Sequence, residues 1–335
     1  MSKALGLLSG GLDSSLAALC LKRQGVEVTA ISFVTPFFGS SKAELAAKQM
    51  GIPLIVENIS EVHLEMLKNP QYGYGKNMNP CIDCHAMMFR LAGEIMAEQG
   101  FDFLFSGEVL GQRPMSQNSN ALRSVANYSG HPDRIIRPLS AKLLPVTPME
   151  EQGLVDRDQL LDIQGRSRKP QEALAKEWGL TDFPSSGGGC LLTEIHFSDR
   201  LRDLVKHQPD CNVDDVELLK IGRQFRLSEQ SKLTLGRHQK DNDAIRAADK
   251  SDYIILRTPG VSGPLGLVSG TPSEDDLQTA GAILATYGKG KDQAEVEVLA
   301  EMPGGEKLFS IAPMSREAAT GMIVCGKQPK ARIAL

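Results

Sequence analysis

The feature that most constrains the fold of this chain is a turn near its start, between a short apolar run and an amphipathic segment. The apolar run is Lys3–Leu8, and residues 9–15 read Ser-Gly-Gly-Leu-Asp-Ser-Ser. Two glycines let the backbone approach an anion closely and turn its N–H groups toward it. A helix that begins near Asp13 adds the positive end of its dipole. This strand–turn–helix junction therefore predicts a phosphate-binding loop in an α/β fold.

Asp13 is the unusual member of this turn, because a carboxylate repels a phosphate unless a cation lies between them. The expected cation is Mg²⁺. The chain has no G-x-x-x-x-G-K-[ST] pattern of a Walker loop, and no G-x-G-x-x-G pattern follows a strand. An ordinary Gly-rich turn with an Asp/Ser cap is the alternative, but the full string on a strand–helix junction favours the phosphate-binding interpretation.

Length and composition limit what the rest of the chain can be. A chain of 335 residues is long for one core and predicts two domains. It is 41% hydrophobic and 23% charged, with no apolar run near the roughly 18 residues of a membrane span. The first residues do not resemble a secretory signal, and six cysteines do not make a disulfide framework in so long a chain. We therefore expect a cytoplasmic protein with reduced thiols and no membrane partner.

The first 140 residues alternate between short apolar runs and helical patterns. The expected strands are Lys3–Leu8, Glu27–Val34, Pro53–Ile59, Phe101–Phe105 and Arg134–Leu139. The expected helices are Ser14–Gln24, Lys42–Met50 and His85–Gln99, with a further helical stretch over Thr147–Trp178. Apolar runs flanked by helices predict a doubly wound parallel sheet, in which ligands bind at the carboxyl ends of the strands.

The character of the sequence changes after about residue 195. Short alternating runs at Lys232–Leu235, Tyr253–Arg257 and Val296–Leu299 are separated by Gly/Pro turns, and one helix is expected at Glu274–Tyr287. We therefore expect an α/β domain over residues 1–195, followed by a smaller α+β domain over residues 196–335.

A group of cations lies between Lys220 and Lys240. The net charge of −4 argues against a protein that coats nucleic acid indiscriminately, so any RNA contact must come from a local patch. This group is either such a patch or a solvated surface. Its candidate RNA-binding residues are Arg223, Arg226 and Arg237.

Three cysteines form a second candidate site. Cys81 and Cys84 make a C-x-x-C at an expected helix start, where a thiol pKa is lowered, and Cys190 ends a Gly-rich loop. Three thiolates around one open position suit a [4Fe–4S] cluster, whereas structural zinc requires a fourth ligand, for which His85 or Cys211 are candidates. Persulfide or disulfide chemistry stays open as the alternative. Two further cysteines are interpreted as core residues: Cys20 and Cys325.

The motifs of the first domain resemble a known family. The Ser9–Ser15 string resembles the PP-loop ATP pyrophosphatases, which are adenine nucleotide alpha hydrolase-like proteins. Together with Met87–Arg90, Ser106–Gln112 and Ser116-Gln117, it resembles the PP-loop domain of the tRNA 4-thiouridine synthetases (ThiI family). The resemblance implies these ATP-binding residues: Leu7, Leu8, Ser9, Gly10, Gly11, Asp13, Ser14, Ser15, Ser32, Phe33, Gly107 and Gln117.

The cysteines resemble those of related enzymes. Asn79-Pro80-Cys81-x-x-Cys84 is similar to the tRNA 2-thiouridine synthetases of the MnmA kind, and Cys190 matches the second reactive cysteine of both families. The three cysteines together also resemble the cluster-dependent, TtuA-like tRNA thiolases. The resemblance implies catalytic roles for Cys81, Cys190 and Asp13, and cluster ligation by Cys81, Cys84 and Cys190.

The second domain resembles a different module. Residues from about 215 to 335 are similar to NFACT-R, an RNA-binding module of ribosome quality-control factors, at Gly222–Ser228, Leu235–His238 and Thr258–Pro264. The 4-thiouridine synthetases carry an RNA-binding THUMP domain before the PP-loop, whereas this sequence begins at the PP-loop. The likeness to NFACT-R favours RNA binding by the cations near residue 230.

Together the resemblances imply an ATP-dependent tRNA sulfurtransferase. It would adenylate a tRNA uridine and replace the carbonyl oxygen with sulfur, with 4-thiouridine as the expected product. The implied cofactors are ATP, Mg²⁺ and a [4Fe–4S] cluster. The implied partners are tRNA and a sulfur donor, either a cysteine desulfurase or free sulfide, and a homodimer stays open. The alternatives are formation of 2-thiouridine, adenylation of a small molecule, and an RNA-binding factor with a vestigial ATP site.

Overall fold

The computed structural model describes residues 1–184, 189–248 and 253–324. The chain forms two compact units, Met1–Thr193 and Glu194–Leu335, which are described separately below. Within the described ranges, no helix combines the length and apolar character that crossing a membrane requires.

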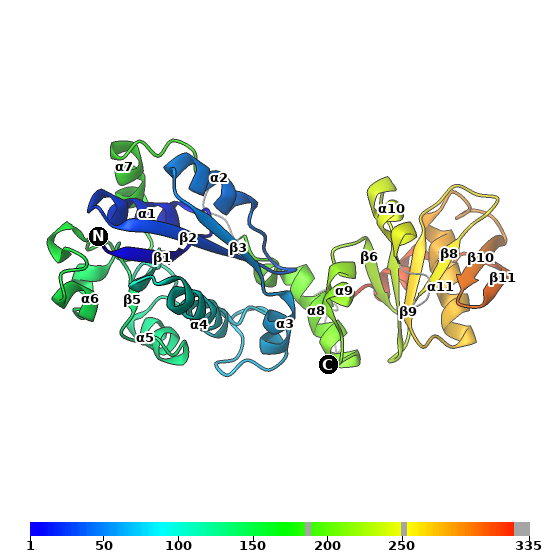
Figure 1. Cartoon of the computed structure of the whole chain (residues 1–335). Helices are drawn as coiled ribbons and strands as arrows, with labels where there is room; N and C mark the ends of the chain where they lie inside the picture. The colour runs from blue at the N-terminus through cyan, green and yellow to red at the C-terminus, as the bar shows by residue number, and fades with distance from the viewer. Residues whose placement is uncertain (185–188, 249–252, 325–335) are drawn as a thin grey trace, which may run out of the picture. The chain divides into compact units, whose positions relative to one another are not determined.

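The first unit is built on a five-stranded parallel sheet with the strand order β3-β2-β1-β4-β5 (Figure 1). Its strands are β1 (Lys3–Leu7), β2 (Glu27–Val34), β3 (Leu54–Asn58), β4 (Phe103–Ser106) and β5 (Ile135–Ile136). The chain first builds outward from β1 through β2 to β3, and then returns to the other side of β1 to form β4 and β5. The boundary between β1 and β4 is therefore the switch point at which ligands bind in such sheets.

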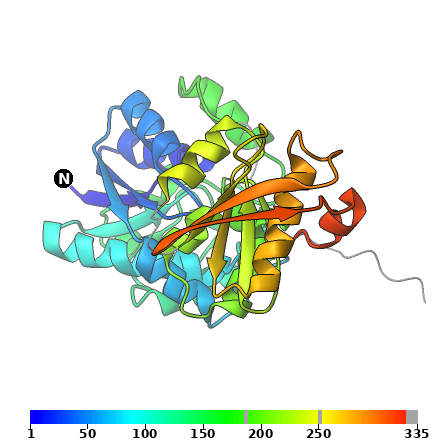
Figure 2. The same ribbon diagram turned by 90° about the vertical axis from the view of Figure 1, so that its right-hand side faces the viewer.

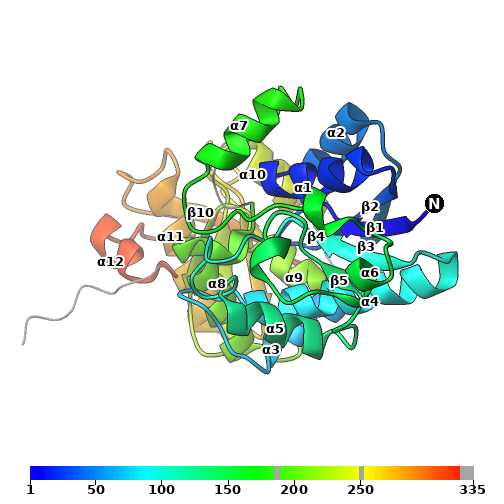
Figure 3. The same cartoon turned by 90° about the vertical axis from the view of Figure 1, so that its left-hand side faces the viewer.

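Helices cover both faces of this sheet (Figure 3). On one face, α1 (Leu12–Arg23), α2 (Ser41–Met50) and α7 (Lys169–Glu177) share an apolar core with the strands. On the other face, α4 (Cys81–Gln99) and α5 (Ser119–Tyr128) bury a second core. The doubly wound parallel sheet predicted from the apolar runs is confirmed.

The continuous helical stretch expected over Thr147–Trp178 is wrong. Thr147 does start a helix, and Glu150 completes a capping box with it, but this helix, α6 (Pro148–Glu151), lasts one turn. The chain then adopts a left-handed conformation at Gly153 (φ 69°), and again at Gly165 (φ 82°) before α7 begins. Glycine adopts such angles without the steric cost that other residues have, so these glycines end the helix despite the periodic apolar residues. The sequence interpretation also missed α3 (Ser60–Lys68) and α5.

The second unit contains a six-stranded sheet with the order β11-β10-β8-β9-β7-β6, and all of its strand pairs are antiparallel. The long hairpin of β10 and β11 is drawn in orange and red-orange in Figure 2. Its strands are β6 (Arg223–Arg226), β7 (Ser231–Leu235), β8 (Ile254–Arg257), β9 (Gly266–Gly270), β10 (Val296–Met302) and β11 (Gly305–Ile311). The antiparallel sheet with helices confirms the α+β class expected for this part of the chain.

The helices of the second unit contribute to separate apolar clusters around this sheet. Ala280, Ile283 and Leu284 of α11 (Glu274–Tyr287) are fully buried in the larger cluster. Ile245 of α10 (Gln239–Ala247) lies in a second cluster with Ile255 and Leu267. The remaining helices are α8 (Ile195–His207), α9 (Val213–Leu218) and α12 (Arg316–Gly321).

Candidate nucleotide and thiol site

The Ser9–Ser15 turn lies at the switch point, where the carboxyl ends of β1 and β4 meet. Gly10 has a φ of 71°, and a Cβ there would lie 2.2 Å from the carbonyl carbon of Lys42. Gly107 follows β4, and a Cβ at that position would lie 2.4 Å from the backbone nitrogen of Ser14. Only glycine fits either approach, so the motif that ends β4 and the turn that follows β1 form one surface.

The hydroxyls of the turn stabilise the start of α1. Ser14 and Ser15 donate to the carbonyl oxygen of Gly11 at 3.0 and 3.1 Å, and the Oγ atoms of Ser9 and Ser14 are 3.2 Å apart. Ser32 and Phe33 are buried near the carboxyl end of β2, the neighbouring strand. The residues predicted to bind ATP therefore belong to adjacent strand ends of one sheet, although their contacts with ATP stay a prediction.

Asp13 is held by a neighbour that the sequence interpretation did not assign. The side-chain amide of Gln112 donates to Asp13 Oδ2 at 3.0 Å. The other oxygen, Oδ1, is buried and has no hydrogen-bond partner in the described part of the chain, and the same is true of Gln117 Oε1. A buried polar atom without a partner costs about 1–3 kcal/mol. These two open acceptors therefore fit a site that a cation and a donor complete, and Asp13 is the residue that would hold Mg²⁺.

The three cysteines of the second candidate site lie near one another. Cys81 and Cys84 occupy the first turn of α4, and negative charge on Cys81 or Cys190 would raise the pKa of Cys84 further. Burial is the main cause of a Cys84 pKa well above its usual range, and burial raises the pKa of Cys190 to about 11. The expectation that the helix start lowers the thiol pKa is therefore wrong for Cys84, because loss of water outweighs the helix dipole.

Polar groups around these thiols hold them in place. His63, which is fully buried, has its Nε2 atom 3.4 Å from Cys84 Sγ, and burial lowers its pKa to about 4. The Asn79 amide donates to Cys81 Sγ at 3.3 Å. Asp83, between the two cysteines, accepts hydrogen bonds from the backbone N–H groups of Gln71 (2.7 Å) and Tyr72. The C-x-x-C thus also fixes the loop that precedes it.

The described side chains do not form the metal site that was expected at the three cysteines. Across the described ranges, no group of three or more His, Cys, Asp or Glu side chains is arranged to hold a metal ion. Residues 185–188 of the Gly-rich loop before Cys190 lie outside those ranges. The [4Fe–4S] cluster therefore stays a prediction, and no step derived below passes through it.

The other candidate ligands and cysteines have separate surroundings. His85 uses its Nδ1 atom to contact Glu108, at 2.7 Å. Cys211 is buried in the second unit. Cys20 is 3% exposed within the core of the first unit, as expected, and Cys325 lies outside the described residues.

Glu108 joins His85 to a buried cation. Arg137 Nε donates to Glu108 Oε2 at 2.8 Å, and the two side chains are 8% and 4% exposed. Burial alone would raise the Glu108 pKa, but the Arg137 charge and the hydrogen bond with His85 more than offset it and lower this pKa to about 2. The carboxylate is therefore ionised at neutral pH and holds the His85 ring by its Nδ1 atom.

A cavity of about 310 Å³ opens beside Cys81. Its lining includes Cys81, Gln112, Arg113 and the rings of Tyr72 and Tyr74. The same Gln112 that donates to Asp13 thus forms part of the cavity wall. The cavity wall therefore includes one of the predicted reactive thiols and the residue that is hydrogen-bonded to Asp13.

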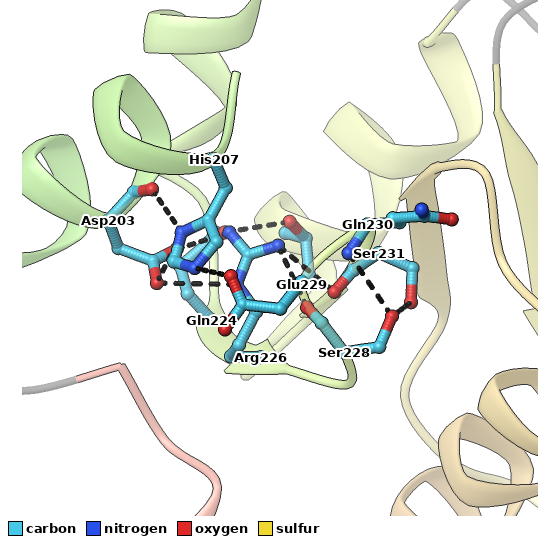
Figure 4. Close-up of polar contacts among 9 residues, drawn as sticks. Asp203, His207, Gln224, Arg226, Ser228, Glu229, Gln230 and Ser231 are labelled. Atoms are coloured by element: carbon cyan, nitrogen blue, oxygen red, sulfur yellow. Dashed lines mark hydrogen bonds and ion pairs between the residues drawn. The ribbon is translucent and has the colours of Figure 1, made fainter. Parts of the chain in front are cut away.

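The three arginines predicted to bind RNA have different surroundings. Arg226 forms a two-pronged ion pair with Asp203 and donates to the Ser231 carbonyl at 3.1 Å (Figure 4). His207 packs beside the same Asp203 and contacts Glu229 at 3.2 Å. Arg226 is therefore largely committed to holding β6 against α8.

Arg237 is more exposed than Arg226, and Arg223 differs from both in its partner. Arg237 Nε donates to Asp241 at 3.0 Å, and its side chain is 42% exposed. Arg223 lies over the ring of Tyr287, with its guanidinium carbon 5.0 Å from the ring centroid. RNA contact by all three arginines stays a prediction, but the structure leaves Arg223 freest of them.

Three residues of the site were missed by the sequence interpretation. Gln112 lies in the quoted Ser106–Gln112 motif, and its long amide could have been paired with Asp13 only once β1 and β4 were known to be neighbours. Asp83 lies between Cys81 and Cys84, and the sequence interpretation assigned roles only to these two cysteines. Tyr72 lies in a loop with no periodic pattern, so no signal in the sequence indicated it.

Comparison with known proteins identifies relatives for both units. Residues 1–142 match a family model described as thiamine biosynthesis protein (ThiI), and residues 222–321 match one described as the NFACT protein RNA binding domain. A tRNA-specific 2-thiouridylase MnmA of Marinobacter nauticus is 24% identical over 307 residues, which cover 79% of this chain and 74% of that protein.

Other relatives match the first unit more narrowly. A probable tRNA sulfurtransferase of Thermotoga maritima is 32% identical over 149 residues, which cover 41% of this chain and 36% of that protein. A solved 4-thiouridine synthetase–RNA complex with bound ATP is 27% identical, with a TM-score of 0.34, and the match covers 41% of this chain and 36% of that one. The chain spans between 34% and 74% of the length of the curated relatives that it matches.

These matches confirm the resemblances that the motifs indicated for each part of the chain. Residues 1–142 are thus similar to the ThiI family model and residues 222–321 to the model of the NFACT RNA-binding domain, and the two curated relatives carry the names of tRNA-thiolating enzymes.

Proposed function

We propose that this protein is an ATP-dependent tRNA sulfurtransferase that converts a uridine to 4-thiouridine. The observation that carries the proposal is one cavity that is lined both by a candidate reactive thiol and by the residue that is hydrogen-bonded to Asp13. Cys81 lines the cavity, and so does Gln112, whose amide donates to Asp13 of the phosphate-binding turn. A substrate in this cavity would lie between the group that binds ATP and the group that handles sulfur.

The lining of the cavity suits an extruded nucleoside. The rings of Tyr72 and Tyr74 belong to residues that are 43% and 40% exposed, which leaves aromatic surface for stacking a base. Arg113 is exposed at the same cavity, and its charge acts to lower the pKa of Cys190. A guanidinium there is suited to the phosphate that flanks an extruded nucleotide. The proposed substrate is therefore a uridine presented out of its stack.

The first reaction is activation of the uridine. Its carbonyl oxygen attacks the α-phosphorus of ATP, the bond to the β-phosphate oxygen breaks, and pyrophosphate leaves. The backbone N–H groups of the Ser9–Ser15 turn and the N-terminus of α1 stabilise the charge on the departing pyrophosphate. Mg²⁺ bound at Asp13 would supply further neutralisation of that charge. The oxygen that was a poor leaving group now departs as AMP.

The second reaction delivers sulfur. A sulfane-sulfur donor first loads Cys190 as a persulfide. The terminal sulfur attacks the activated carbon, AMP departs, and a disulfide then links the base to Cys190. The Cys81 thiolate attacks the Cys190 sulfur, which breaks that disulfide, leaves a thiocarbonyl on the base, and joins the two cysteines. An external thiol reduces the Cys81–Cys190 disulfide for the next cycle.

The test is thiolation of tRNA from a strain that lacks the modification. Purified protein is incubated with this tRNA, ATP, Mg²⁺, an external thiol and a cysteine desulfurase with cysteine as the sulfane-sulfur donor, and the digested nucleosides are separated and identified by mass spectrometry. We expect ATP-dependent 4-thiouridine. Formation of 2-thiouridine would show that the carbonyl at position 2 of the base, and not the one at position 4, is thiolated. Pyrophosphate release without any thiolated nucleoside would contradict the proposal.

A cavity variant sharpens this test. Tyr72→Ala should weaken use of tRNA while leaving binding of ATP intact, because Tyr72 lines the cavity and is not one of the residues predicted to bind ATP. Leu45→Ala, at a residue of α2 that is 68% exposed, serves as the control for loss of an exposed apolar side chain. Equal thiolation by the two variants would place the base elsewhere.

A further inference from the structure

Two guanidinium groups in the second unit share one aromatic ring. The guanidinium carbon of Arg316 lies 4.0 Å from the centroid of the Tyr287 ring, and that of Arg223 lies 5.0 Å from it. Phe225 supports the ring from the core side, at 5.7 Å and in an edge contact. These residues come from β6, the last turn of α11 and the start of α12, so the tertiary fold itself assembles the group.

These two arginines have no carboxylate partner in the part of the chain that the structure describes, which separates them from other arginines of the unit. Arg226 is paired with Asp203, Arg237 with Asp241, and Arg257 with Glu301. Both guanidinium carbons lie within 5.0 Å of the same ring centroid, and two like charges repel each other. The ring face attracts both cations, and the carbonyl end of α11, where Tyr287 is the last residue, adds a favourable negative potential.

This arrangement is suited to one kind of ligand. Each guanidinium offers a planar set of donors that matches the oxygens of a phosphate. The ring is already occupied by the two cations, so it is not free to stack a base. We infer that Arg223 and Arg316, held together by Tyr287, form a phosphate-binding site for the RNA backbone. The inference rests on the proposed function, because it takes tRNA as the ligand.

A backbone site has a distinct signature. Binding of RNA phosphates releases counterions, and loss of one phosphate contact lowers the slope of log K against log salt by about one. Arg223→Gln combined with Arg316→Gln should therefore lower that slope by about one to two and weaken tRNA binding by about tenfold at low salt. The preference among RNA sequences should not change, because phosphate contacts carry no base information.

The control is a second double variant with the same change in net charge. Arg202→Gln with Arg246→Gln removes two exposed arginines of the same unit, each of which is already paired with an aspartate of its own helix. It should leave the affinity and the salt slope near those of the unchanged protein. Equal affinities and equal slopes for the two double variants would overturn the inference.

The ring itself can be tested as the holder of the two cations. Tyr287→Leu should weaken tRNA binding, and Tyr287→Phe should restore it, since the face of the ring is retained. Melting curves confirm that both variants are folded. If Tyr287→Leu is folded and binds tRNA normally, the ring does not organise the site and the inference fails.

Two further results keep this inference separate from the proposed function. Thiolation of tRNA by the Arg223/Arg316 double variant should show a raised KM with kcat unchanged, whereas no tRNA binding by the unchanged protein would contradict the proposed function itself. Inorganic phosphate, added at matched ionic strength, should not displace tRNA, because one phosphate replaces only one of several contacts. Complete displacement would assign the site to a free phosphorylated ligand and overturn the RNA assignment.

Discussion

The candidate sites of the two units differ in how their polar groups are partnered. In the first unit, Asp13 Oδ1 and Gln117 Oε1 are buried acceptors without partners at the switch point of the sheet. In the second unit, Arg226 and Arg237 already hold carboxylates, and only the Arg223–Arg316 pair among the arginines discussed above is left to an aromatic ring. An incomplete set of hydrogen bonds indicates a ligand site, whereas a charge count alone does not.

The largest expected effect is loss of thiolation in variants of the reactive cysteines. If these cysteines instead held a metal cluster, the open acceptors at Asp13 and Gln117 would not be the main feature of the first unit. Cys81→Ser and Cys190→Ser should each abolish thiolation, since each thiol makes or breaks a bond to sulfur. Cys84→Ser should keep most activity, because Cys84 is buried against His63 and takes no part in the relay.

The same experiment tests the cluster directly. Protein reconstituted with iron and sulfide without oxygen is assayed for iron, colour and thiolation. A brown protein with about four irons per chain that loses its iron in any of the three cysteine variants would replace the relay with a cluster. Iron-free protein that still thiolates tRNA would confirm the relay.

The next effect tests the open acceptor of the first unit. Asp13→Ala should slow pyrophosphate release by about 100- to 1,000-fold, the range seen when one stabilising group at a developing charge is removed. Glu94→Gln, at an exposed carboxylate of α4 that is paired with Arg90, should leave the rate unchanged. Release is measured with ATP and tRNA, together with a melting curve for each variant. An unchanged rate in a folded Asp13→Ala protein would remove the turn from the chemistry.

A third prediction concerns a group of the first unit that is fully paired. The Glu108 pKa of about 2 lies below the ordinary carboxyl value of about 4.3. The ionised group therefore stabilises the fold above pH 4.3, and this contribution is lost as the pH falls toward 2. Glu108→Gln should lower the free energy of unfolding by about 3 kcal/mol at pH 7 and by about half of that near pH 3.

Denaturant unfolding at both pH values measures this difference. Glu94→Gln, whose ion pair with Arg90 is exposed, should cost about 0.5 kcal/mol or less at either pH. A Glu108→Gln penalty that does not depend on pH would show that the carboxylate acts through packing and not through its charge.

The smallest expected effect sharpens the contrast within the second unit. Arg226→Gln should lower the melting temperature, because it leaves Asp203 without its main cation, yet change tRNA affinity by about twofold or less. Melting curves and tRNA binding at two salt concentrations check both parts. A tenfold loss of tRNA affinity with an unchanged melting temperature would show that Arg226 contacts RNA, as the sequence predicted.

The sequence predicted the strands and helices that leave a pattern in their own residues. The apolar runs for β1 to β4 and the helix at Glu274–Tyr287 were placed well, because burial on both faces and a capping box leave direct patterns. The break between α6 and α7 was missed, since its glycines act through backbone angles that the apolar periodicity does not show.

The candidate site was predictable as a set of residues but not as an arrangement. The Ser9–Ser15 turn and the Ser106–Gln112 motif are readable in the chain, whereas the hydrogen bond between Gln112 and Asp13 depends on β1 and β4 being neighbours. Thiol reactivity was misjudged for Cys84 because a helix start is visible in the sequence and burial by distant segments is not.

Gln112 belongs to both candidate sites, and it can couple them thermodynamically. It is bonded to Asp13 on one side and forms part of the cavity wall on the other. In the proposed reaction, a cation that draws Asp13 toward a nucleotide would shift Gln112, and a base that displaces Gln112 would act back on Asp13. Linkage makes the two effects equal, so whatever factor ATP applies to tRNA affinity, tRNA applies to ATP affinity.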